Sequence, residues 1–186
     1  NVPRIGVRFR LPASMNQVEY FGRGPAENYL DRNAGSMVGL YKSTAEELYF
    51  PYVRPQENGH HTDTRWVSLS TGKKGLLIQA DNTIGFNALR NSIEDFDDEE
   101  ATGLSRQWSN FTPEQVANHD EAAAKNVLRR QHHINDITPR DFVEVCVDLK
   151  QQGVAGYDSW GSRPEPAYTL PANREYNWGF TLIPLK

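Results

Sequence analysis

Apolar residues occupy every second position in 5–11, 143–149 and 176–182, and the positions between them are mostly polar residues or glycine. A period of two indicates β-strands that each bury one face. Weaker alternation predicts six more strands, over 17–21, 35–41, 48–52, 65–70, 75–80 and 83–89. The TGKKG stretch at 71–75 is typical of a hairpin turn between two of them.

Short strands separated by turn residues predict an all-β fold, a sandwich of antiparallel sheets in one domain over residues 1–186. One short helix is expected at about 112–125. Thr112 is its candidate N-cap, Pro113 stands at the first helical position, and Gln115 has the spacing of a capping box.

Charge and composition argue against several classes of partner and structural feature. The net charge of −4 argues against a nucleic-acid partner, and no run of 18 apolar residues predicts a membrane span. The chain starts at Asn1 without a signal-like apolar segment, so we expect a segment cut from a longer protein. A single cysteine, Cys146, excludes an internal disulfide and leaves both the cytoplasm and the periplasm open.

Two features look like metal sites. The acidic run Glu94–Glu100 lacks the alternating ligands and the glycine of a calcium loop, so we expect a solvated loop. Adjacent histidines, at 60–61 and 132–133, point to opposite sides of an extended chain and cannot chelate together. We interpret them as partly exposed loop residues and expect no metal or cofactor in this chain.

Five carboxylates lie in loops rich in glycine, proline and asparagine: Glu27, Asp31, Glu57, Asp63 and Asp158. Two of them could form the acid–base pair of a glycosidase if their spacing allowed it. Taken singly, each is better interpreted as a loop anchor that accepts backbone N–H bonds.

Three loops, at 21–32, 48–66 and 153–166, mix aromatic rings, arginine, amides and acids on a frame of glycine and proline. Such loops suit sugars, because a ring packs on the C–H face of a pyranose and planar polar groups bind its hydroxyls. For most of the aromatic residues, packing is the favoured interpretation: Tyr20, Tyr29, Tyr52 and Trp66. Trp160 differs, because its small neighbours offer little bulk to cover a ring.

Several longer motifs occur in a fixed order along nearly the whole chain: PRIGVRF at 3–9, GRGPAENYLDR at 22–32, LYFPYVRPQENG at 48–59, TDTRW at 62–66, GVAGYDSWG at 153–161 and PAYTLPANREYNWGFTLIP at 166–184. With these motifs the chain resembles the C-terminal β-sandwich portion of a LacZ-type glycoside hydrolase family 2 β-galactosidase.

The resemblance implies an antiparallel supersandwich like that of galactose mutarotase, and a chain that covers the later part of a larger domain. It also implies that the catalytic glutamates, the magnesium and the sodium belong to a barrel domain of the same polypeptide. The isolated chain would then be inactive. Trp160 matches the family tryptophan that lines the galactoside site, with Asp158 and Tyr157 as further candidates for substrate binding.

The chain departs from the family pattern at Tyr157, where an acid or amide is usual, at Ala155, where glycine is usual, and in a longer stretch over 90–110. Missing strands would leave free edges that invite pairing with a partner or a second copy. Two alternatives stay open. One is a free-standing carbohydrate-binding module, and the other is a mutarotase-like epimerase using His60, His61 and Glu57.

Overall fold

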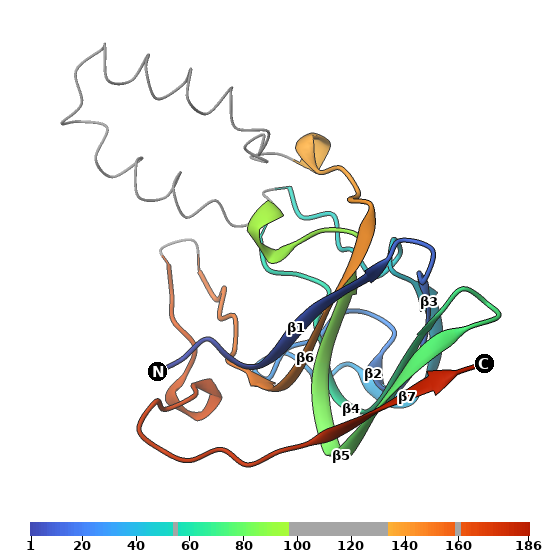
Figure 1. Cartoon of the computed structure of the whole chain (residues 1–186). Coiled ribbons are helices and arrows are strands. Elements are labelled where there is room, and N and C mark those ends of the chain that lie inside the picture. Colours follow the sequence, from blue (N-terminus) through green and yellow to red (C-terminus); the bar gives the residue numbers. More distant parts are fainter. Residues whose placement is uncertain (54–55, 97–133, 159–160) are drawn as a thin grey trace, which may run out of the picture. The chain divides into compact units, whose positions relative to one another are not determined.

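The computed structural model describes residues 1–53, 56–96, 134–158 and 161–186 (Figure 1). The chain divides into two compact units. The first comprises Asn1–Phe50, Asn58–Arg90 and Arg140–Lys186, and the second comprises Pro51–Glu57 and Asn91–Pro139.

The first unit is built on one antiparallel sheet of seven strands: β1 (Arg4–Pro12), β2 (Gln17–Gly24), β3 (Met37–Thr44), β4 (His61–Ser70), β5 (Gly75–Leu89), β6 (Phe142–Gln151) and β7 (Phe180–Leu185). Their order is β1-β6-β5-β4-β2-β3, and β7 also pairs with β5. The prediction of an all-β, antiparallel fold is therefore confirmed, and the sheet is consistent with a sandwich. The likeness to galactose mutarotase stays a prediction.

Strand β5 is long enough to serve two neighbours along one edge. Its first half, Gly75–Ala80, pairs with β7, and Gly85–Leu89 pairs with β6 (Figure 1). Along the other edge β5 pairs with β4, with register shifts near Thr64. Such irregularities let strands bend and change direction within a sheet. The strands expected at 75–80 and 83–89 are thus one element.

The core of this unit lies on one side of the central strands. Most of its fully buried apolar side chains come from β2, β4, β5 and β6: Val18, Tyr20, Val67, Leu69, Ile78, Ile84, Phe86, Ala88, Val143, Val145 and Val147. They alternate along each strand with less buried residues on β2 and β4, as the period of two predicts. On β6 both faces are buried from Val143 to Asp148, which the alternation there did not predict.

Strand β1 is an edge of the described sheet, and its arginine side chains bind the acidic residues of the neighbouring strand β6. Asp148 is only 1% exposed and binds Arg4 through both oxygens, at 2.6 and 3.2 Å. Glu144 is likewise buried and accepts from Arg10 at 3.0 Å, with Arg8 at 3.6 Å. Each buried carboxylate is therefore paired, as its desolvation requires.

The apolar face predicted for β1 is only half-buried, and Val7 is 46% exposed. A strand at a sheet edge has a neighbour on one side alone, so its apolar face receives less cover. Three strands of the described sheet have a partner on one side alone: β1, β3 and β7. Pairing of such an edge with a second copy stays a prediction.

Several boundaries differ from expectation: β2 ends at Gly24, β3 covers Met37–Thr44 and β4 starts at His61. No strand forms at 48–52, because Thr44 and Glu47 bond reciprocally, 3.1 and 3.2 Å from backbone N to side-chain oxygen, and turn the chain. Buried Leu48 then closes the turn by donating its N–H to Thr44 O at 3.0 Å. Strand β7 starts at Phe180 instead of Tyr176. The hairpin at 71–75 is confirmed, with Thr71 N–H donating to Lys74 O at 2.8 Å.

The described part of the second unit holds two 3-10 turns, η1 (Ile93–Asp95) and η3 (Ile134–Asp136). Asp95, in the acidic run predicted to be solvated, is instead 5% exposed and accepts the Ser92 N–H at 2.9 Å. The rest of that run after Phe96 and the helix predicted at 112–125 lie outside the described residues. No helix among the described residues is long and apolar enough to cross a membrane.

Candidate functional site

Within the first unit, three segments that the sequence singled out meet. The first loop is 25–36, between β2 and β3. The second segment is 58–60, which leads into β4. The third loop is 152–158, which follows β6. None of them belongs to the sheet, so their conformations depend on bonds that they make with one another.

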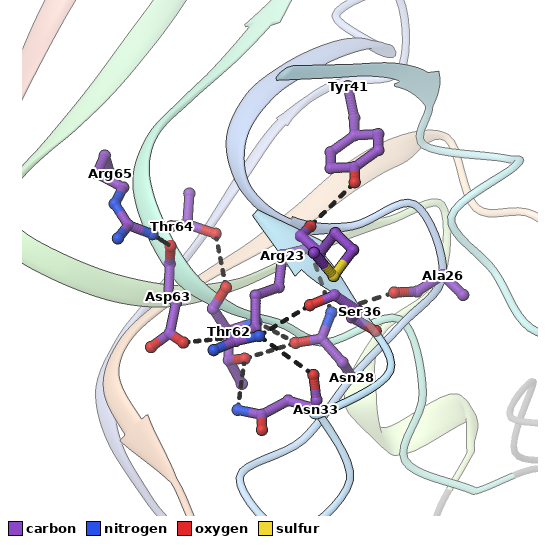
Figure 2. A network of polar contacts seen from close by, with 11 residues as sticks. Arg23, Ala26, Asn28, Asn33, Ser36, Tyr41, Thr62, Asp63, Thr64 and Arg65 are labelled. Atoms are coloured by element: carbon purple, nitrogen blue, oxygen red, sulfur yellow. Dashed lines mark hydrogen bonds and ion pairs between the residues drawn. The ribbon is translucent and has the colours of Figure 1, made fainter. Parts of the chain in front are cut away.

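Asn28 joins the first loop to the start of β4 (Figure 2). Its backbone N–H donates to His60 O at 2.7 Å, and its side-chain oxygen accepts from the N–H and hydroxyl of Thr62, at 2.9 and 2.5 Å. Its amide nitrogen donates to the backbone oxygens of Arg23 and Ala26, both at 3.1 Å. A fully buried amide with every polar atom bonded fixes the loop rigidly.

Arg23, near the end of β2, binds the far end of the same loop and the start of β4 (Figure 2). Its Nε lies 2.5 Å from Asp63 Oδ2, and its Nη1 donates to the backbone oxygens of Ser36 and Asn33, at 2.8 and 3.3 Å. Asp63 has a φ of 51°, a left-handed conformation that aspartate tolerates better than most residues. The network therefore stabilises the loop ends against β4.

Glu27 connects the first loop with the second segment. Its carboxylate accepts the Gly59 N–H at 2.6 Å and pairs with Arg32. The Arg32 guanidinium also lies 4.7 Å from the centre of the Tyr29 ring, which stacks on His60 with centroids 5.5 Å apart. Carboxylate, guanidinium and rings therefore form one packed layer.

Asp31 connects the first loop with the third. Its two oxygens accept the backbone N–H groups of Val154 and Ala155, at 3.2 and 2.7 Å. Gly153 lies so close to this carboxylate that a Cβ there would overlap it. Ala155 and Gly156 have φ values of 55° and 86°, so the loop turns sharply directly after the contact.

The third loop presents two of the three residues predicted to bind substrate. Tyr157 and Asp158 are exposed, and Trp160 lies outside the described residues. The pKa of the Tyr157 phenol is raised by desolvation and then by the negative charges of Asp31 and Glu165. An exposed phenol beside carboxylates is a hydrogen-bond donor at neutral pH, which is chemistry suited to a sugar hydroxyl.

The two described histidines are core residues, which corrects their interpretation as partly exposed loop residues. His60 is 1% exposed, and its Nδ1 lies 2.8 Å from Asn87 Oδ1, while burial lowers its pKa to about 3. His61 is fully buried between the backbone oxygens of Gly59 and Pro25, at 3.1 and 3.2 Å, and burial lowers its pKa as well. Both rings are neutral at pH 7 and sealed from solvent.

The rings of these histidines also pack against aromatic side chains of the core. The His61 ring lies 5.0 Å from Tyr20 and 5.1 Å from Phe86, measured between centroids. Tyr20 and Tyr29 are themselves fully buried, which confirms that they fill the core. Gly85 allows this packing, since a Cβ there would overlap the His60 ring.

The interpretation of single carboxylates as loop anchors that accept backbone N–H bonds is confirmed for Glu27 and Asp31. Asp63 differs, because it lies in β4 and its carboxylate accepts from the Arg23 side chain. In the ranges that the structure describes, no three histidine, cysteine or acidic side chains gather as a metal site. Sequence reasoning missed the central role of Asn28 and Arg23, although both lie inside the GRGPAENYLDR motif.

A hollow of about 370 Å³ lies on the other face of the sheet, away from these loops. It is lined by Glu19, Trp66, Ser68, Leu77, Gln79 and Leu185. Register places Phe21 beside Trp66 on this face, where Leu40 of β3 follows. Trp66 is thus half-buried on a strand, and does not stand in a loop.

Comparisons of this chain with known proteins all point to the same family. The family model described as "Beta galactosidase small chain" matches residues 1–182. A β-galactosidase of Priestia megaterium is 35% identical over 185 residues, which are 99% of this chain and 15% of that protein. A β-galactosidase of Vibrio cholerae is 29% identical over 97% of this chain and 14% of its own length. One of Arthrobacter is 42% identical over half of this chain. The chain thus spans about 15% of the first of these relatives.

Proposed function

This chain belongs to the β-galactosidase small-chain family, and on that premise we propose that it is the C-terminal domain of an enzyme that removes terminal β-D-galactose from lactose-like sugars. Its relatives are β-galactosidases, and each is several times longer than the matched segment. The remaining length is available for the barrel domain that carries the catalytic glutamates.

The reaction would follow the retaining mechanism. One glutamate of the barrel attacks the anomeric carbon and forms a galactosyl–enzyme ester, while a second protonates the leaving oxygen and then activates water. No residue of this chain matches either glutamate. Under this proposal the magnesium and sodium of the full enzyme would belong to the barrel domain.

The contribution of this chain would be a surface for the sugar. Trp160 would stack on the leaving-group sugar, and Tyr157 and Asp158 would bind hydroxyls beside it. The observation that carries this proposal is the attachment of the third loop to Asp31, which joins an exposed, aromatic loop to the sheet through the first loop. Such pre-ordering is what a stacking surface requires, because an ordered loop loses little entropy on binding.

A mutarotase-like activity in this chain is not supported by the site. An epimerase needs an acid and a base that reach the sugar. His60 and His61 are buried and bonded to an amide and to backbone oxygens. At neutral pH their lowered pKa values leave both without a proton to give as imidazolium.

Titrating the isolated chain with galactose and lactose tests the proposal against a free-standing module. We expect no binding at millimolar concentration, no hydrolysis and no acceleration of galactose anomerisation.

The full enzyme should release galactose first as the β-anomer, which NMR detects. Millimolar binding by the isolated chain would support a carbohydrate-binding module, and faster anomerisation would support an epimerase.

A further inference from the structure

We propose that Asp31 is a positioning residue of the galactoside site, one that sets the third loop in place without touching the sugar. The proposal rests on the proposed function, because it assigns the effect of Asp31 to the recognition of the leaving-group sugar. Asp31 lies 123 residues before Val154 in the chain, so only the fold joins them.

The first step is the contact itself. Each oxygen of the carboxylate accepts one backbone N–H, from Val154 at 3.2 Å and from Ala155 at 2.7 Å. The preceding residue, Gly153, donates its N–H to Tyr168 O at 2.8 Å. Three successive N–H groups of the third loop are therefore bonded, and two of the three acceptors are oxygens of one side chain.

The second step is the backbone conformation. Ala155 and Gly156 are both left-handed, with φ of 55° and 86°. Successive N–H groups beside left-handed residues form concave sites that bind anions. An ionised carboxylate suits that concavity, and charge-assisted hydrogen bonds of this kind are stronger than neutral ones.

The third step is that Asp31 itself is fixed. Arg32, the next residue, donates its N–H to Tyr29 O at 2.9 Å and pairs with Glu27, which also accepts the Gly59 N–H. The main chain around Asp31 is therefore held by the buried layer of Tyr29 and His60. A displacement of the carboxylate would move the third loop, and with it Tyr157 and Asp158.

Asp31→Asn in the full enzyme is the test, because the amide has the same shape but can accept at one atom only. We expect faster hydrogen exchange in a peptide covering 153–158. We also expect kcat/KM for lactose to fall roughly tenfold, mainly through KM, since even a 1 Å displacement of a positioning group can be costly. The hydrolysis of nitrophenyl galactoside, which lacks the second sugar, should change less.

Two further variants test whether the effect of Asp31→Asn is specific to Asp31. Glu46→Gln alters a carboxylate that binds Arg90 and Asn16 far along the chain from the third loop, and should change neither readout. Asp31→Ala should lower kcat/KM for lactose at least as much as Asp31→Asn. If Asp31→Ala does not fold, the isosteric asparagine variant alone decides.

The outcomes separate this proposal from the proposed function. Unchanged exchange at 153–158 in Asp31→Asn would overturn the positioning role, and Trp160→Ala in the same enzyme would still report on the sugar surface. Faster exchange with unchanged kinetics for lactose would also overturn it, and would count against any role of the third loop in the site. An equal loss with lactose and nitrophenyl galactoside would point to general destabilisation and overturn it as well.

Discussion

The β1–β6 strand pair and the first loop both contain buried or bonded carboxylates, but the groups that these carboxylates bind differ. On β6, Asp148 and Glu144 pair with arginine side chains of the neighbouring strand. In the first loop, Glu27 and Asp31 accept backbone N–H groups of other segments. The carboxylates of β6 therefore lie in a register that ladder hydrogen bonds already fix, whereas those of the first loop bond to segments that lie outside the sheet.

This difference indicates which carboxylates contribute to global stability and which hold a single segment in place. Removing an arginine of β1 weakens the compensation of a buried carboxylate on β6 and should affect global unfolding. Removing a carboxylate of the first loop should release one segment locally and leave the sheet intact.

The largest effect is expected from Arg4→Met. It leaves the buried Asp148 carboxylate without its bidentate partner and should lower the free energy of unfolding by about 3–5 kcal/mol in denaturant titrations. Arg8→Met is the matched control on the same strand. Arg8 is 42% exposed at its side chain and 3.6 Å from Glu144, so its loss should cost no more than about 1 kcal/mol. Equal losses in the two variants would refute the role of the buried pair.

Acid should destabilise the first unit through His60. Burial lowers its folded-state pKa to about 3, below the unfolded value of 6.5. The unfolded chain therefore binds the proton first, and stability is lost as the pH falls from about 6.5 towards 3. The slope is about 1.4 kcal/mol per pH unit for this group.

Denaturant titrations from pH 7 to 5 measure that slope. The His60→Gln variant should be less stable at pH 7 but show a shallower pH dependence, because it lacks the titrating ring. Parallel pH profiles for the two proteins would mean that His60 does not titrate differently in the folded and unfolded states.

A smaller and local effect is expected from Glu27→Gln. The change weakens the bonds to Gly59 and Arg32 and should cost about 1–3 kcal/mol, as for a hydrogen bond to a charged group. Exchange of the Gly59 amide should accelerate far more than exchange in β5 or β6. Uniform acceleration across the sheet would contradict the local role of the first loop.

Ala155→Gly should produce the smallest change, and in the stabilising direction. Ala155 adopts φ of 55°, where a Cβ is strained by about 1 kcal/mol relative to glycine. The higher entropy of glycine in the unfolded state offsets part of this gain. A thermal midpoint raised by a few degrees or less would fit, and a clear fall would show that the alanine side chain makes a favourable contact.

Strict alternation predicted β1 and β6 well, but the same pattern over 176–182 placed the start of β7 four residues too early. The sequence could not show that Arg4 would lie beside Asp148, because register joins residues 144 positions apart. The burial of His60 and His61 was missed for a related reason, since polar residues enter a core only when distant partners such as Asn87 satisfy them.

The strand wrongly expected at 48–52 could have been avoided from the sequence. Thr44 and Glu47 have the spacing of a capping box, which indicates a turn instead of the strand expected at 48–52. Composition singles out the three loops and their carboxylates, and the structure shows that Glu27 and Asp31 join the described parts of these loops. Which loop each carboxylate binds depends on the fold, so only the structure could show it.

The most direct measurement of the central claim is kcat/KM for lactose in the full enzyme carrying Trp160→Ala. Loss of an aromatic contact of roughly 0.5–1.5 kcal/mol predicts a two- to tenfold fall. The Trp66→Phe variant, altered on the sheet face, serves as a control for general destabilisation. An unchanged kcat/KM in a folded Trp160→Ala enzyme would contradict the proposal that this chain lends a sugar-binding surface to the galactosidase site.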